Sequence, residues 1–137
     1  MLMREFVAPA LNERGFTGTM AFRRDLPNGW HLLTFQGSHR PSSGAVLLTI
    51  DVGAITTKAW AERKIWFAEH TPAVKVPTKP TATWADPERI GMLRMGLDHW
   101  YEYAPDADMA ALCKRLMSDI DKYAVPYMEK RVSSVVK

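Results

Sequence analysis

Apolar and polar side chains alternate along residues 16–52, and this period of two constrains the fold more than any other feature of the chain. Such alternation is typical of strands that are buried on one face only. The cluster at 25–29 is rich in turn residues and contains Asn28-Gly29, a common β-hairpin dipeptide. A polar loop at 37–44 separates two further strands, at 30–36 and 46–52. The pattern therefore predicts a three-stranded antiparallel meander.

Helical patterns occupy both ends of the chain. Apolar residues between 2 and 11 recur at spacings of three and four, and Pro9 is expected to kink or split this helix. Asp106 or Asp108 is expected to begin a longer helix, and Pro126 a last short helix that ends at about Arg131. We expect these terminal helices to pack against the sheet.

The middle of the chain is more varied. We expect a helix within 54–69, capped by Thr56 or Thr57, then an ordered crossing loop over 71–87 and a hairpin of 90–95 and 97–103 that turns at Gly96. The predicted fold class is α+β: an antiparallel sheet of about five strands with the N- and C-terminal helices packed on one face. The residues expected in the core are Phe22, Phe35, Val46, Leu48, Ile50 and Val52 from the strands, and Phe6, Leu11, Leu112, Leu116 and Ile120 from the helices.

Length, cysteine content and charge narrow the class of protein. The 137 residues are expected to form a single domain, 1–137. Cys113 is the only cysteine, which excludes an intramolecular disulfide. We find no pattern of a signal peptide and no apolar run that could span a membrane, so we expect a cytoplasmic protein without membrane contact. The formal net charge of +3 is spread along the chain and predicts a mixed, solvated surface. The oligomeric state stays open.

Several short groups of residues stand in a characteristic order along nearly the whole chain. They are Phe6 with Pro9 and Leu11, Gly15-Phe16, Phe22-Arg23-Arg24, Phe35-Gln36-Gly37-Ser38, Ser43-Gly44, Thr49-Ile50-Asp51-Val52-Gly53, Arg89-Ile90-Gly91, Trp100-Tyr101-Glu102 and Tyr123-Ala124-Val125-Pro126-Tyr127. As an ordered set they resemble a bacterial family called domain of unknown function 4304. At positions 37 and 51 this chain has Gly37 and Asp51, where the family often carries Lys and Asn. Chemistry that needs that lysine or that asparagine is therefore not expected here. The resemblance implies a compact α+β domain and a bacterial origin, and it implies no established activity.

The sequence contains no recognisable catalytic motif. Its four histidines lack the spacing of a metal site, and it has neither a phosphate-binding glycine loop nor a serine nucleophile elbow. Cys113 lies on the apolar stripe of a predicted helix, where a buried thiol would be inert. We therefore expect no catalytic residue, no metal and no cofactor. The sequence favours a non-enzymatic protein without deciding the question.

Aromatic and basic residues indicate possible contacts with a macromolecule. Trp84 stands alone in the polar, proline-rich loop and is the best single candidate for contact with a partner protein, unless it folds back over the sheet edge. Nucleic-acid binding is less favoured, because core packing explains two of the three relevant tryptophans, Trp30 and Trp66. The residues of that interpretation are Arg23-Arg24, His39-Arg40, Lys75 and Lys79, with Trp30, Trp66 and Trp84.

We expect a binding site on the sheet face opposite the predicted core. That face carries Arg23, Thr34, Gln36, Thr49 and Asp51 beside the apolar Trp30, Leu32 and Leu47. The loop after Gln36 could add Ser38, His39 and Arg40, and Arg94 could join from the predicted hairpin, on a side of the sheet that the sequence leaves open. The alternative is that Asp51 only pairs with a nearby arginine and the loop is a plain surface turn.

Three functions remain open at this stage. The leading hypothesis is a non-enzymatic module that binds another protein. The alternatives are a small-molecule-binding or hydrolytic enzyme that uses the polar sheet face, and a nucleic-acid-binding protein. The candidate binding residues are Arg23, Gln36, Ser38, His39, Arg40, Asp51, Trp84 and Arg94.

Overall fold

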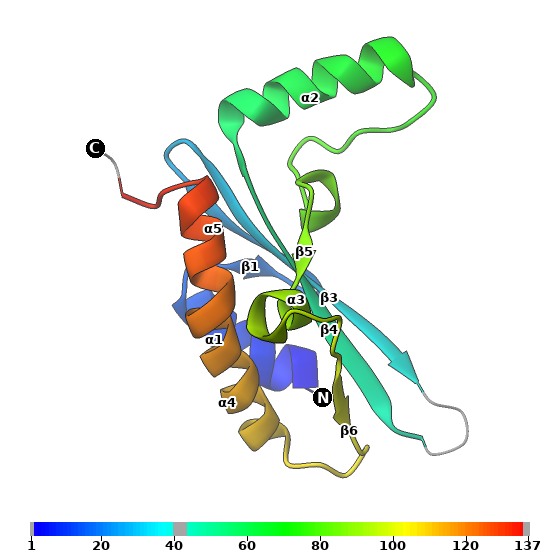
Figure 1. The fold of residues 1–137 in the computed structure, drawn as a ribbon, viewed down its shortest axis with the longest axis vertical. Coiled ribbons are helices and arrows are strands. Elements are labelled where there is room, and N and C mark those ends of the chain that lie inside the picture. The colour runs from blue at the N-terminus through cyan, green and yellow to red at the C-terminus, as the bar shows by residue number, and fades with distance from the viewer. Residues whose placement is uncertain (1, 40–43, 136–137) are drawn as a thin grey trace.

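The computed structural model in Figure 1 describes residues 2–39 and 44–135. In this part of the chain, six strands form one antiparallel sheet in the order β1-β2-β3-β4-β5, and β6 also pairs with β4. The strands are β1 (Thr17–Gly18), β2 (Ala21–Leu26), β3 (Gly29–His39), β4 (Val46–Thr56), β5 (Glu88–Arg89) and β6 (Tyr101–Tyr103). The predicted meander is confirmed, because its three strands are β2, β3 and β4.

The hairpin between β2 and β3 turns within the predicted cluster at 25–29, one residue earlier than a turn centred on Asn28-Gly29. Leu26 pairs with Gly29, so Pro27 and Asn28 close the turn between β2 and β3. A Cβ atom on Gly29 would lie 2.4 Å from the carbonyl oxygen of Ile55, so only glycine allows β4 to approach this end of β3. From there β3 and β4 stay paired over eleven residues, and this long ladder is the centre of the sheet.

The helices at the two chain ends lie together on one side of the sheet, as predicted (Figure 1). At the N-terminus, η1 is π-helical and leads directly into α1. At the C-terminus, α4 continues through the π-helical η3 into α5. The helices are η1 (Leu2–Val7), α1 (Ala8–Glu13), α2 (Thr57–His70), η2 (Ala82–Trp84), α3 (Ile90–Met95), α4 (Met109–Asp119), η3 (Ile120–Ala124) and α5 (Val125–Arg131).

Proline accounts for the change of helix type at both ends. Pro9 and Pro126 each stand in the first turn of an α-helix, directly after a π-helical segment. Proline has no backbone N–H, so a continuous helix would lose a hydrogen bond at that point. The change of hydrogen-bond register absorbs this loss. The predicted break at Pro9 is therefore a change of helix type rather than a gap, and Pro126 begins its α-helix as expected.

The core is largely the predicted one. It packs strand residues such as Phe22 and Ile50 against helix residues such as Leu11 and Leu116, all 1% exposed or less. Phe6 and Val46 differ from the expectation, because both are only half-buried. Val46 lies at the far end of β4, where the sheet extends past the helices.

The predicted hairpin of 90–95 and 97–103 is wrong. Residues 90–95 form α3, and only Tyr101–Tyr103 become a strand. Ile90 and Leu93 are one helical turn apart and both pack on the core. Gly96, expected to turn the hairpin, instead ends the helix in the left-handed conformation with φ 75°. Six residues are too few for the apolar pattern to separate helix from strand.

The face opposite the core is only partly open, which also corrects an expectation. At the end of the sheet near Thr56, a second cluster packs α2 and the loop before β5 onto Leu32 and Ile55. Its other buried members are Trp60, Ala82 and Ala85, and Trp30 lies half-buried against them. Trp30 and Leu32 therefore belong to a small second core and not to the polar site.

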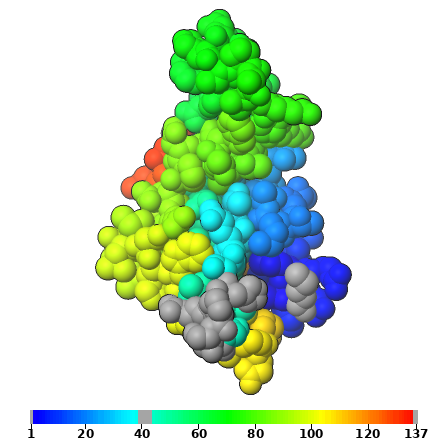
Figure 2. All heavy atoms as spheres, turned by 90° about the vertical axis from the view of Figure 1, so that its right-hand side faces the viewer, coloured from blue at the N-terminus to red at the C-terminus, as the bar shows by residue number. Residues whose placement is uncertain are grey.

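The predicted helix after β4 is confirmed as α2. Thr56 is its N-cap, and its hydroxyl accepts a hydrogen bond from the N–H of Ala59 at 3.0 Å. Trp66, however, is 50% exposed, so its assignment to the core is wrong. Figure 2 shows the reason: α2 and the following loop form a lobe that projects from one end of the molecule.

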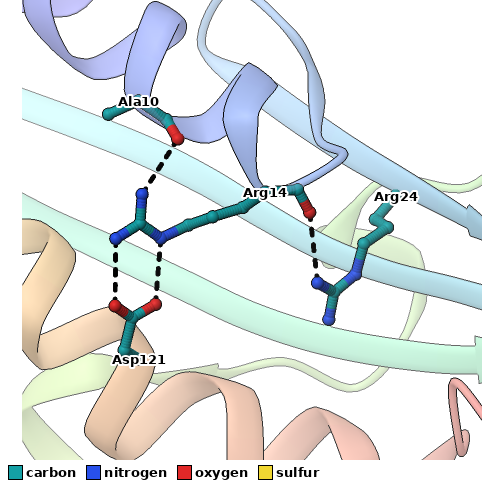
Figure 3. Close-up of polar contacts among 4 residues, drawn as sticks. All are labelled: Ala10, Arg14, Arg24 and Asp121. Atoms are coloured by element: carbon teal, nitrogen blue, oxygen red, sulfur yellow. Dashed lines mark hydrogen bonds and ion pairs between the residues drawn. The ribbon is translucent and has the colours of Figure 1, made fainter.

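A buried histidine joins the sheet to the C-terminal helix. His31 is fully buried, and its Nδ1 accepts a hydrogen bond from the guanidinium of Arg24 at 2.7 Å. Its Nε2 donates to the carbonyl of Val132 at 2.6 Å. Arg24 in turn donates to the carbonyl of Arg14 at the end of α1 (Figure 3). Burial lowers the pKa of His31 and the adjacent guanidinium lowers it further, although the Val132 carbonyl opposes them.

We expect this histidine to make the stability of the fold depend on pH. Because burial in the folded chain lowers the pKa of His31, the unfolded chain takes up the proton first as the pH falls, near the ordinary pKa of about 6.5. The free energy of unfolding should therefore fall as the pH drops from about 7 to about 5.5, with a slope of at most about 1.4 kcal/mol per pH unit from this group. Urea unfolding at several pH values measures it. In His31→Gln the slope should be smaller, and an unchanged slope would assign the pH dependence to other groups.

Candidate functional site

The register of β3 and β4 brings the predicted polar residues together. Gln36 pairs with Thr49, and Thr34 pairs with Asp51 on the neighbouring row. All four side chains point away from the helices, because residues two apart on a strand share a face. We call these four residues the polar half of the open face. The hydroxyls of Thr34 and Thr49 are buried and have no hydrogen-bond partner among the described residues.

Asp51 is the centre of a charged network on this face. It is 7% exposed and accepts a short hydrogen bond from the side-chain amide of Gln36. Its other oxygen lies 3.5 Å from Nε of Arg89, whose guanidinium also donates to Asp98 at 2.6 Å. The guanidinium stacks over the ring of Trp100, 5.1 Å from its centroid. Asp51 thus has an arginine partner, as the alternative interpretation predicts, and the pair continues into further charged and aromatic groups.

A hollow of about 590 Å³ opens beside this network. Ser38 and Leu47 line it from β3 and β4, and the segment before β6 adds Asp98, His99 and Trp100. Glu102 of β6 and Arg115 of α4 complete the lining. The hollow therefore combines an indole, an imidazole, a hydroxyl and charges of both signs.

The sequence did not predict that Arg89, beside Asp51, or Asp98, His99 and Trp100, in the lining of the hollow, would belong to this site. Arg89 reaches Asp51 because β5 pairs with β4 exactly at that position, and a two-residue strand leaves no periodic signal. Asp98, His99 and Trp100 fell within the wrongly predicted hairpin. The sequence does carry one indication of these residues. The groups Arg89-Ile90-Gly91 and Trp100-Tyr101-Glu102, which resemble the family, lie at the two ends of residues 89–102.

The other candidate residues are dispersed. Ser38 lines the hollow, whereas Arg40 and the side chain of His39 lie outside the described part of the chain. Arg23 belongs to β2, and it pairs with Asp25 at 3.1 Å instead of with the polar half of the open face.

Arg94 lies on the side of the sheet that the helices cover. Its guanidinium donates to Asp119 of α4 at 3.1 Å and stacks over the ring of Tyr101. The Tyr101 hydroxyl donates to the same carboxylate at 2.6 Å, and burial together with this bond raises its pKa. The Arg94 guanidinium also contacts Nδ1 of His99 at 2.8 Å. Arg94 therefore does not face the hollow; it contacts His99, one of the lining residues, from the helix side.

Trp84 is at the other end of the molecule. It is half-buried and packs edge-to-face on Trp60 and Phe67, with ring centroids 6.2 and 5.1 Å apart. A second, smaller hollow of about 330 Å³ lies between this tryptophan, Trp66 and Arg63. Trp84 thus folds back, but onto α2 and not over a sheet edge.

The described residues include no group of three or more His, Cys, Asp or Glu side chains placed to hold a metal ion. Cys113 is buried, and burial raises the pKa of its thiol, which makes the thiolate scarce at neutral pH. Across 2–39 and 44–135, the helices are too short or too polar to cross a bilayer. The geometry beside the hollow is one of paired charges around the ring of Trp100.

Comparison with known proteins places this fold in a family. The profile of the family described as Domain of unknown function (DUF4304) matches residues 7–130. The chain belongs to this family. A search of curated proteins gave no significant match, and neither did a search of solved structures. The DUF4304 match spans the sheet, the polar half of the open face and the whole lining of the hollow.

Proposed function

We propose that this DUF4304 chain is a non-enzymatic module that binds another protein through the hollow and the polar half of the open face. The observation that carries the proposal is a group of exposed apolar side chains in the segment that leads into the lining of the hollow. Met92, Met95 and Leu97 are 40%, 49% and 53% exposed, and Asp98 begins the lining directly after them. Neighbouring exposed apolar residues of this size mark interaction surfaces.

The composition of this surface fits a protein partner. Trp, Met and Arg are enriched in protein interfaces, where an apolar centre is surrounded by polar groups. Here Trp100 and Leu97 supply the apolar part, and Ser38, Asp98 and Arg115 supply hydrogen bonds and charge of both signs. A small ligand is usually enclosed by its pocket, whereas this hollow is wide and open.

The wall of the hollow is held in place before any partner binds. A Cβ atom on Gly91 would lie 2.6 Å from backbone atoms of His99, so α3 packs directly on the segment before β6. The contacts of Arg94 with His99 and Asp119 tie the same segment to α4. A preformed surface loses little conformational entropy on binding, which supports recognition of a folded partner.

Site-specific photocrosslinking tests this proposal. A photoreactive amino acid placed at residue 97 should form a discrete protein adduct in a native lysate, while the same group at residue 74 should not. Val74 is a matched control, because it is 44% exposed and belongs to the lobe at the other end of the molecule. Once the adduct is identified, Leu97→Asp should weaken binding of the purified partner by about tenfold or more, and Val74→Asp should leave it unchanged.

The remaining outcomes contradict the proposal. Equal adducts from both positions would show that the surface is not selective. A small molecule retained in native mass spectrometry and displaced by Trp100→Ala would favour the small-molecule alternative. Binding of nucleic acid that falls steeply with salt would favour the nucleic-acid alternative.

A further inference from the structure

Helix α2 has an inner face that holds it to the molecule. Trp60 is 2% exposed in the second core, and Arg63 donates both to the carbonyl of Trp84 and to Asp86 at 2.9 Å. Phe67 packs on Trp84 from the next turn. These contacts fix the orientation of the helix, which projects from one end of the molecule (Figures 1 and 2).

The outer face of α2 is apolar at its centre and exposed. With about 100° between successive residues, Ile65 points to the side opposite Phe67 and Trp60. Ile65 is 59% exposed, and the neighbouring Trp66 is 50% exposed. Ala61 and Ala68 flank Ile65 one turn away on either side, and both are exposed. Nothing in the described chain covers this face.

Charges of opposite sign lie near the two ends of the outer face, and exposed Glu62 adds a second acid about 60° from Ile65 around the helix axis. Lys58 lies in the first turn and Glu69 in the last, within about 40° of Ile65 around the helix axis. Both are exposed, and neither forms an ion pair with another described residue. When a second copy of this helix runs in the opposite direction, the lysine of each copy faces the glutamate of the other.

We propose that α2 is the interface of an antiparallel homodimer of this chain. A two-fold axis beside the middle of the helix places Lys58 of each copy against Glu69 of the other, which forms two equivalent ion pairs. The same axis sets Ile65 of each copy level with Glu62 of the other, so the two Ile65 side chains lie about 4.5 Å apart along the helix direction. The alanines on the opposite flank allow the helices to approach closely. A parallel arrangement would instead bring like charges together, which excludes it.

One helix per copy makes a small interface, well below that of a tight complex, so the association should be weak. Its surface lies at the opposite end of the molecule from the hollow. A dimer therefore leaves two hollows free, and bivalence would raise the apparent affinity for a partner that presents two copies of its surface. The proposed dimer does not depend on the proposed partner site, so an experiment can contradict one proposal without contradicting the other.

Sedimentation velocity of the purified chain tests the dimer. Between about 1 μM and about 1 mM the wild-type chain should move from a monomer towards a dimer. Lys58→Glu and Glu69→Lys should each weaken the association by about tenfold or more, because each places two pairs of like charges in contact. The combined Lys58→Glu, Glu69→Lys variant should restore it, and Lys114→Glu on the exposed side of α4 should not affect it.

The charge-exchange variant separates this proposal from other kinds of association. If the wild-type chain stays monomeric throughout the concentration range, the dimer is excluded. If the combined variant is as weak as either single variant, the antiparallel geometry is wrong. All exchanged residues are exposed, so the melting temperatures should agree within about 3 °C.

Discussion

An aspartate in place of Leu48 is expected to unfold most of the protein. Leu48 is 3% exposed on the central strand β4, where it lies between Gly37 of β3 and Tyr101 of β6 and faces the helices. A carboxylate there would have no partner, and burying it costs several kcal/mol, a large part of a stability of about 5–15 kcal/mol. Circular dichroism and thermal unfolding should show loss of the cooperative transition.

The adjacent residue supplies the control. Leu47 is on the same strand but faces the hollow, where it is half-buried. Leu47→Asp should keep the native circular dichroism spectrum and lose no more than about 1–2 kcal/mol. If both variants lose the same stability, the assignment of the two faces is wrong.

Removal of Asp119 is expected to have the second largest effect. Its carboxylate accepts hydrogen bonds from Arg94 and Tyr101, and the side chains of the ion pair are only 14% and 16% exposed. Asp119→Ala would leave the Arg94 guanidinium without its carboxylate in a partly buried place, at a cost of about 3 kcal/mol. Urea denaturation measures this loss directly.

The ion pair of Arg14 with Asp121 is a matched control. It is bidentate, at 2.9 and 3.0 Å, and joins α1 to η3 (Figure 3), but the Asp121 side chain is 53% exposed. Asp121→Ala should therefore cost at most about 1 kcal/mol. A double variant, Arg94→Met with Asp119→Ala, should be more stable than Asp119→Ala alone. If Asp119→Ala and Asp121→Ala lose equal stability, burial is not what makes the Asp119 contact strong.

Local patterns predicted the meander because they depend on neighbours in the chain. A strand buried on one face alternates wherever it lies, and Asn28-Gly29 favours a tight turn before any tertiary contact forms. Helix starts followed the same rule: Thr56 and Asp108 cap their helices through hydrogen bonds to backbone groups three residues away.

The failures came from short segments and from contacts between distant parts of the chain. Residues 90–95 carry an apolar pattern that fits either a helix or a strand, and packing of Ile90 and Leu93 on the core decided for the helix. Trp66 reads as a core residue by type, yet the projection of α2 leaves it exposed. An aromatic side chain shows its size in the sequence but not its surroundings.

In the candidate site, too, the sequence predicted some of the neighbouring residues and missed others. The neighbourhood of Gln36 and Asp51 followed from the period of two and the hairpin register, which adjacent strands set between them. Arg89 and Trp100 joined them only through the pairing of β5 and β6 with β4 and the packing of α3.

The amino-acid sequence by itself determined the meander, the apolar face of its strands, the capped helices and the family. Each of these features depends on residues that are close together along the chain. Only the tertiary structure decided that α3 is a helix, that Arg94 pairs with Asp119 on the helix side, and that a hollow opens before β6. These features depend on contacts between segments up to tens of residues apart, whose free energy is gained only when the whole core assembles.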